Sequence, residues 1–120
     1  MEVLEIFKAL AHENRLRILN LLWEQSLCVC ELKNILDINQ SNASRHLRKL
    51  KQARIVEDER NGQWVYYKIN QKQVQKHSFL KKIILEELKD NAELEKDRRN
   101  LYKYQKSEVT CETLDETNIF

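Results

Sequence analysis

Two cysteines stand almost side by side in this sequence, Cys28 and Cys30, with only Val29 between them. Thiolates are soft ligands that prefer thiophilic ions to magnesium or calcium. The pair lies at the start of a predicted short helix, 29–36, and a helix N-terminus lowers the pKa of a thiol and favours the thiolate. Two buried, packed thiols are the alternative interpretation, because cysteine is among the most buried residue types.

The spacing of the two cysteines limits how they could hold an ion. Positions i and i+2 of a regular helix point about 200° apart, given its number of residues per turn. Cys28 and Cys30 could therefore bind one small ion only if the first turn of helix 29–36 deforms. We expect ligand binding to change the shape of this helix.

A basic, amphipathic segment follows. Residues 44–54 carry five basic side chains and no acidic one, and Ala43, Leu47 and Leu50 fall on one face of a predicted helix over 40–53. A basic cluster on a chain of net charge +2 indicates a docking face for a polyanion. A solvated helix face is the alternative.

The order of these elements is that of a helix-turn-helix: a helix over 29–36, a tight turn at 37–39 and a helix over 40–53. The second helix of this motif enters the major groove of DNA. Gln, Asn and Arg side chains can bond base edges, while the following basic residues bond phosphates. His46 is next to the inward-facing Leu47, so it either contacts DNA or packs within the fold. The candidate contacts are Gln40, Ser41, Asn42, Ser44, Arg45, His46, Arg48 and Lys49.

A β-hairpin is predicted next, with strands over 55–60 and 63–69. Asn61-Gly62 is the pair that a two-residue type I′ turn prefers. Its tip would touch the flanking DNA through Arg60, Asn61 and Gln63. The predicted fold is therefore mainly α with a small β-hairpin, a winged helix-turn-helix.

Helices over 2–10 and 13–25 complete the predicted core, and a helical stretch runs from about 71 to 105. A helix of about 30 residues would measure roughly 45 Å, at about 1.5 Å per residue. Its apolar stripe exceeds what the core can cover, which predicts a homodimer. We expect one DNA-binding and dimerisation domain over 1–106 and a flexible tail over 107–120.

Composition narrows the function classes. The chain has 120 residues, no apolar run of the roughly 18 residues that a membrane span needs, and no signal-peptide pattern. Three cysteines, an odd number, favour reduced thiols in the cytoplasm over a disulfide framework. No nucleophile elbow, phosphate loop or acid–base cluster is present, so we expect neither an enzyme, nor a catalytic cofactor, nor a membrane partner.

Four segments resemble the ArsR/SmtB family of metal-responsive repressors. The resemblance covers roughly residues 4–70 and implies a dimeric repressor that leaves its operator, a double-stranded DNA site, when a metal or metalloid binds. It implies that Cys28 and Cys30 are the sensor, with trivalent arsenic or antimony as the inducer. The matching segments are Leu4–Leu19, Leu27–Leu32, Gln40–Leu47 and Gly62–Tyr67.

The sequence departs from that family at one place. Arsenite sensors of the family often carry a third cysteine three residues after the second, where this chain has Lys33. Cys111 could supply the third thiolate from its own or the partner subunit, or a small thiol or a methylated arsenical could complete the site. Cadmium stays open as an inducer, whereas His77 alone does not provide the family's zinc site. The alternative function is a thiol-redox-responsive or constitutive regulator whose cysteines bind no metal.

Overall fold

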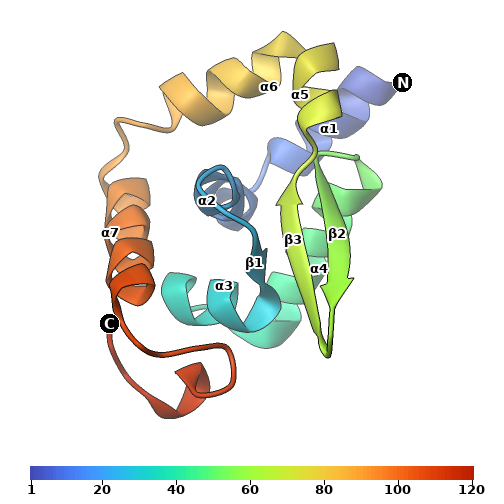
Figure 1. Ribbon diagram of the computed structural model, residues 1–120. Helices are drawn as coiled ribbons and strands as arrows, with labels where there is room; N and C mark the ends of the chain where they lie inside the picture. Colours follow the sequence, from blue (N-terminus) through green and yellow to red (C-terminus); the bar gives the residue numbers. More distant parts are fainter.

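The computed structural model describes residues 1–120. Figure 1 shows α2 at the centre, with α7 on one side, α3 and α4 on the other sides, and α5 and α6 above. The elements are α1 (Glu2–Leu10), α2 (Glu13–Leu22), β1 (Leu27–Cys28), α3 (Val29–Leu36), α4 (Gln40–Gln52), β2 (Val56–Asn61), β3 (Trp64–Ile69), α5 (Gln71–Lys76), α6 (Ser78–Lys82), the π-helical turn η1 (Ile83–Glu87), α7 (Ala92–Lys106) and the 3-10 turn η2 (Leu114–Glu116).

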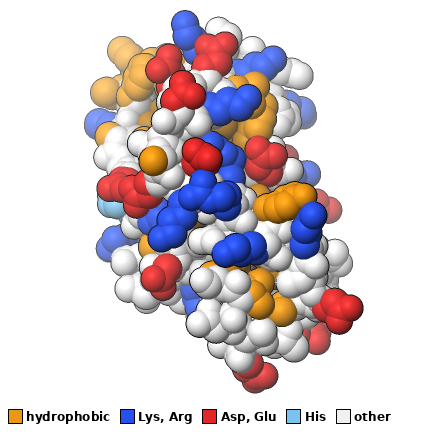
Figure 2. All heavy atoms as spheres, turned by 90° about the vertical axis from the view of Figure 1, so that its left-hand side faces the viewer, with side chains coloured by type: hydrophobic (Ala, Val, Ile, Leu, Met, Phe, Trp, Pro, Cys, Tyr) orange, Lys and Arg blue, Asp and Glu red, His pale blue; other side chains and the backbone are white.

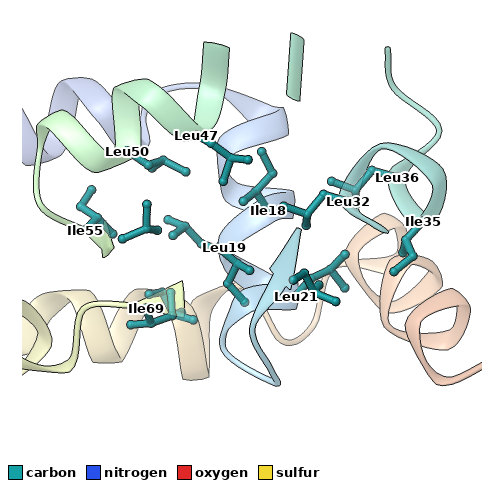
Figure 3. Packing of buried hydrophobic residues seen from close by; sticks show 14 of the residues in the cluster. Ile18, Leu19, Leu21, Leu32, Ile35, Leu36, Leu47, Leu50, Ile55 and Ile69 are labelled. Carbon is teal, nitrogen blue, oxygen red and sulfur yellow. The ribbon is translucent and has the colours of Figure 1, made fainter. Parts of the chain in front are cut away.

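The hydrophobic core forms around α2. Ile18, Leu19 and Leu21 are fully buried there. Figure 3 shows leucine and isoleucine side chains from α3, α4 and the strands converging on these three residues. Burying branched aliphatic side chains from several elements around one helix fixes how those elements are oriented. The core thus sets the position of α4 relative to α3.

The helix-turn-helix is confirmed, and its two helices begin where the sequence predicted. Helix α3 ends at Asp37, which takes the left-handed conformation (φ 54°) that closes a helix. Asn39 then caps α4, because its side chain accepts a hydrogen bond from the backbone N–H of Asn42 at 2.8 Å. These two helix caps make the turn short and place the N-terminus of α4 at the surface.

The hairpin is also confirmed, although its turn differs from the predicted one. Asn61 pairs with Trp64 as the last rung of the β2–β3 ladder, so the turn residues are Gly62 and Gln63. Only Gly62 has a positive φ, 65°, which matches a type II′ turn rather than type I′. A short strand that the sequence analysis missed, β1, pairs antiparallel with β3 through Leu27 and Tyr67, giving the sheet order β1-β3-β2.

The single long helix predicted over 71–105 is wrong. The backbone leaves the helical conformation at His77 (φ −122°, ψ 87°), and Asn91 starts a new helix by accepting hydrogen bonds from the N–H groups of Glu93 and Leu94. Helix α7 then turns back and packs on α2 and α3 of the same chain. Its apolar stripe is therefore covered within the chain. None of the helices has the length and apolar character that crossing a membrane requires.

The last segment, 107–120, lies across α3 in the structure, whereas the sequence had favoured a flexible tail. Leu114 is 1% exposed and belongs to the hydrophobic core. The side chain of Asp115 forms an ion pair with Lys33 of α3 at 3.0 Å and accepts a hydrogen bond from Asn34 at 2.8 Å. These contacts bring the tail next to the start of α3.

Candidate nucleic-acid interface and thiol cluster

Helix α4 has an apolar face toward the core and a polar, basic face toward solvent. Ala43, Leu47 and Leu50 are buried. Arg45 lies on the outer face and donates a hydrogen bond to Asn42 Oδ1 at 3.1 Å. No acidic residue lies in the first turn, so the partial positive charge of the helix N-terminus is not offset there. Of the predicted contacts, Gln40, Ser41, Arg45, Arg48 and Lys49 are exposed, and Asn42 and Ser44 are half-buried.

The hairpin lies beside α4 as a wing (Figure 1). Its tip residues Arg60, Asn61 and Gln63 are exposed, as a contact with flanking DNA requires. Lys51 of α4 bonds Asp58 of β2 at 2.8 Å, which links the wing to the helix. Because its charge is already paired, Lys51 contributes less than Arg48 or Lys49 to the attraction of phosphates.

His46 does not lie on this surface, contrary to its place among the predicted DNA contacts. Its side chain is 1% exposed, and its Nδ1 accepts a hydrogen bond from Nε of Arg15 at 3.2 Å. The ring of His12 lies 4.2 Å from the His46 ring, centroid to centroid. Burial, together with these positive neighbours, lowers the pKa of His46 to about 4. His46 is therefore a neutral packing residue between α2 and α4.

The thiols are arranged differently from the helical pair that the sequence suggested. Cys28 is the N-cap of α3 and has an extended backbone (φ −89°, ψ 171°), so only Cys30 is on the helix. The Sγ atom of Cys28 lies 3.2 Å from Sγ of Cys111 in the tail. Cys30 lies beside this pair, with its Sγ 3.7 Å from the carbonyl oxygen of Cys111. The structure therefore brings all three cysteines together at the start of α3.

Glu31 is a member of this cluster that the sequence analysis missed. It is 5% exposed, and its Oε1 accepts a hydrogen bond from the backbone N–H of Cys28 at 2.9 Å. The other oxygen, Oε2, accepts a hydrogen bond from the hydroxyl of Tyr104 on α7. With Cys28 as N-cap, Glu31 completes a capping box, and that spacing of N-cap and N3 residue was the signal available in the sequence.

Burial favours the protonated form of Cys28 and Cys30 in the free protein. Burial is the main cause that raises the pKa of Cys28 far above its usual range, and it also raises the pKa of Cys30. The hydrogen bond with Cys111 is the main cause that raises the pKa of Tyr66 to about 12. The thiolate that a helix N-terminus was expected to favour is thus not the resting form, and an ion that binds sulfur must displace the protons.

A cavity of about 340 Å³ joins the thiols to the start of α4 and to the wing. It is lined by the three cysteines, by Gln40 at the start of α4 and by Trp64 at the beginning of β3. A change in the position of the tail or of the α3 N-terminus therefore occurs directly against the first residue of the candidate recognition helix.

Comparisons with known proteins agree with this architecture. A family model described as "Bacterial regulatory protein, arsR family" matches residues 12–58. The chain is 47% identical over 66 residues to the arsenic resistance transcriptional regulator ArsR1 of Pseudomonas putida, a match covering 54% of this chain and 52% of that one. It is 44% identical over 62 residues to the cadmium resistance transcriptional regulatory protein CadC of Listeria innocua, covering 51% and 52%. The matched part thus spans about half the length of these curated relatives.

A solved structure extends the similarity to most of the chain. It is the homodimeric winged helix-turn-helix DNA-binding domain of a possible ArsR-family transcriptional regulator from Mycobacterium bovis. The TM-score is 0.62 at 32% identity, over 72% of this chain and 80% of that one. The fold, the position of the basic helix and the matched segments lead to one assignment: the chain is a winged helix-turn-helix protein and belongs to the ArsR family.

Proposed function

We propose that this protein is a homodimeric transcriptional repressor that binds operator DNA and is released by a thiophilic metalloid, trivalent arsenic or antimony, bound by Cys28, Cys30 and Cys111. The observation that carries the proposal is the convergence of three thiols at the start of the helix-turn-helix. Relatives named for arsenic and for cadmium resistance support the class of inducer.

The DNA-binding part of the proposal uses the exposed faces of α4 and the wing. Asn42 and Arg45 lie in the first two turns of α4, where a recognition helix meets base edges. Arg48 and Lys49 follow on the exposed side and would hold phosphates. The proposed contacts are Gln40, Ser41, Asn42, Ser44, Arg45, Arg48, Lys49, Arg60, Asn61 and Gln63.

The donor set fits a trivalent metalloid. Three sulfur atoms are available, and soft thiolates select thiophilic ions. Lys33, which occupies the place of the family's third cysteine, holds Asp115 of the tail. This ion pair positions Cys111 four residues earlier in the chain, so the tail would supply the sulfur that α3 lacks. Trivalent arsenic in water carries three hydroxide groups, so each new bond to sulfur would replace one bond to hydroxide, and the thiol proton would leave with that hydroxide as a water molecule.

Release from DNA would follow from the place of the cluster. Sγ of Cys30 is directed at the carbonyl of Cys111 rather than at the other two thiols, so it must turn to join them. That movement shifts the first turn of α3 in the cavity that it shares with Gln40. Linkage then requires DNA and inducer to weaken each other's binding by the same factor.

The exposed apolar face of α1 is the proposed dimer surface. Leu4 is 47% exposed and Phe7 49% exposed, and Phe7 stacks on Phe79 of α6 with ring centroids 5.1 Å apart. Glu2 of α1 also forms an ion pair with Lys76 at the end of the neighbouring α5, at 2.9 Å. A second copy of the chain would cover this α1–α6 face, as the homodimeric relative supports.

A specific observation favours a second candidate, a repressor that responds to oxidants. Cys28 and Cys111 are both free and their sulfur atoms are in contact. Hydrogen peroxide could take two electrons and two protons from the pair, so that a disulfide forms as the peroxide O–O bond breaks to give two water molecules. In that case the cysteines would respond without any metalloid.

The test is a titration of the repressor–DNA complex, using the DNA upstream of the gene that encodes the chain. Fluorescence anisotropy would follow release by arsenite and antimonite in the presence of a reductant, and release by peroxide in its absence. Release by the metalloids under reducing conditions is the expected result. Release by peroxide alone would establish the second candidate, and no release by either would refute both.

A further inference from the structure

We propose that Cys28, Glu31 and Cys111 form a second, overlapping site that binds a divalent cation of the zinc and cadmium type through two sulfurs and one carboxylate oxygen. This inference rests on the proposed function only because the two sites share Cys28 and Cys111. Its distinguishing element is Glu31, which has no part in binding the trivalent metalloid.

The geometry brings three ligand atoms together without Cys30. One ligand atom from each of Cys28, Glu31 and Cys111 lies within 4.8 Å of the other two. Sγ of Cys30 is instead occupied with the carbonyl oxygen of Cys111 and with the amide of Asn34. The preformed cluster therefore offers two sulfur atoms and one carboxylate oxygen. Cys30 or a water molecule would be the fourth ligand.

Glu31 is held in the orientation that a ligand needs. The backbone N–H of Cys28 fixes one oxygen and the hydroxyl of Tyr104 the other. A carboxylate offers about four lone-pair positions, so two donors leave acceptor capacity for an ion. Hydrogen bonds of this kind orient ligands around metal ions, and Tyr104 would have that role here.

The chemistry of the donor set selects the ion. Zinc and similar divalent cations accept thiolate and carboxylate ligands in one tetrahedral shell. Trivalent arsenic takes its three bonds from sulfur and has no need of a carboxylate. On binding, Cys28 and Cys111 each release one proton to solvent, so two thiolates and the Glu31 carboxylate face a doubly charged ion. Glu31 would therefore discriminate between the two classes of ion, while Cys30 is required only for the trivalent one.

The test compares Glu31→Gln with the wild-type chain. Glutamine keeps the capping box through its single oxygen, and its amide N–H can donate to the Tyr104 hydroxyl, but it removes the anionic ligand. Cadmium affinity would be measured by competition with a chromophoric chelator and by sulfur-to-cadmium absorption, and arsenite affinity by competition with a dithiol. We expect cadmium binding to weaken at least about tenfold, as loss of site residues typically does, with arsenite binding unchanged. Glu112→Gln, an exposed acid lining the same cavity, is the matched control and should change neither.

The outcomes separate this site from the proposed function. Unchanged cadmium affinity in Glu31→Gln would overturn the inference, and so would an equal loss for cadmium and arsenite, since it would make Glu31 a structural cap only. X-ray absorption of cadmium bound to the wild-type chain tests the same point without any variant: sulfur and oxygen neighbours are expected, and a shell of sulfur alone would contradict the site. A chain that binds cadmium through Glu31 but ignores arsenite would refute the proposed function alone.

Discussion

The sulfur atoms of Cys28 and Cys111 lie 3.2 Å apart although 83 residues separate them in the sequence. One belongs to the N-cap of α3 and the other to a tail held on α3 by Asp115. The tail is thereby part of the candidate sensor, and the candidate recognition helix α4 begins at the wall of the same cavity.

The first prediction concerns Cys111. Cys111→Ser should bind operator DNA with wild-type affinity yet need a much higher arsenite concentration for release, because one of three sulfurs is lost. Cys28→Ser and Cys30→Ser should behave alike. Anisotropy titrations in a reductant would measure all three variants. A normal response of Cys111→Ser would leave a two-thiolate site on Cys28 and Cys30.

The second prediction concerns Arg45, an exposed residue of α4. Arg45→Ala should weaken operator binding by about 1–3 kcal/mol, the usual loss for a base-contacting arginine. Lys82→Ala, an exposed residue on α6 outside the proposed interface, is the control at identical salt. Equal affinity of Arg45→Ala and wild type would remove Arg45 from the interface.

The third prediction concerns assembly. Phe7→Glu places a charge in the proposed α1–α6 dimer face and should give a monomer at micromolar concentration. Tyr102→Glu changes another exposed aromatic residue, 57% exposed on α7, and should leave the assembly intact. Sedimentation equilibrium measures both. A dimer that survives Phe7→Glu but not Tyr102→Glu would move the interface to α7.

The fourth prediction concerns the ion pair that holds α7 on α2. Arg17 donates two hydrogen bonds to Asp97, at 2.8 and 3.0 Å, and the Asp97 side chain is 3% exposed. Asp97→Ala should lower the free energy of unfolding by about 3 kcal/mol, because it leaves a partly buried guanidinium without its partner. Glu95→Ala removes the exposed pair with Arg99 on the same helix and should lower it by less than about 1 kcal/mol. Urea denaturation would show equal losses if the Arg17 pair were only a surface contact.

The fifth prediction concerns pH. The folded-state pKa of His46 is lowered to about 4 from 6.5, so the unfolded chain binds this proton at higher pH. The stability contributed by neutral His46 is therefore complete above pH 6.5 and is lost as the pH falls toward 4, by about 3 kcal/mol in all. His46→Gln keeps an acceptor for Arg15 but cannot titrate. Its urea midpoint should fall less than that of wild type between pH 7 and 5, and parallel curves would contradict the prediction.

The parts of the fold that the sequence predicted are those that local interactions determine. Helix α4 begins at a side-chain cap, Asn39, and the hairpin turns at a glycine, and both signals lie within a few residues of the structure they produce. Strand β1 was missed because its two residues become a strand only by pairing with β3. The break before α7 was missed for a similar reason: Asn91 was available as a cap, but docking through Asp97 and Arg17 decides that the helix turns back.

In the candidate site, too, the sequence identified what local spacing determines and missed what depends on distant contacts. Cys28 and Cys30 were recognisable from their spacing, and Cys111 could be named only as one possible third ligand. Its contact with Cys28 depends on how the tail crosses α3. Glu31 was missed because its role depends on its burial and on the hydrogen bond that it accepts from Tyr104, 73 residues away in the sequence. The sequence left His46 open between a DNA contact and a packing residue because its helical position borders both faces of α4, and the hydrogen bond from Arg15 decides for packing.

The position of Cys111 beyond α7 has a genetic consequence. A stop codon between Lys106 and Cys111 would leave all seven α-helices and the wing encoded while deleting the sulfur that comes from the tail. Under the proposed function, such an allele produces a repressor that occupies its operator and needs a much higher inducer concentration for its release. Because subunits of both kinds would pair in a heterozygous strain, the mutant phenotype is expected to be dominant, and cells carrying it would be selected against whenever the inducer is toxic.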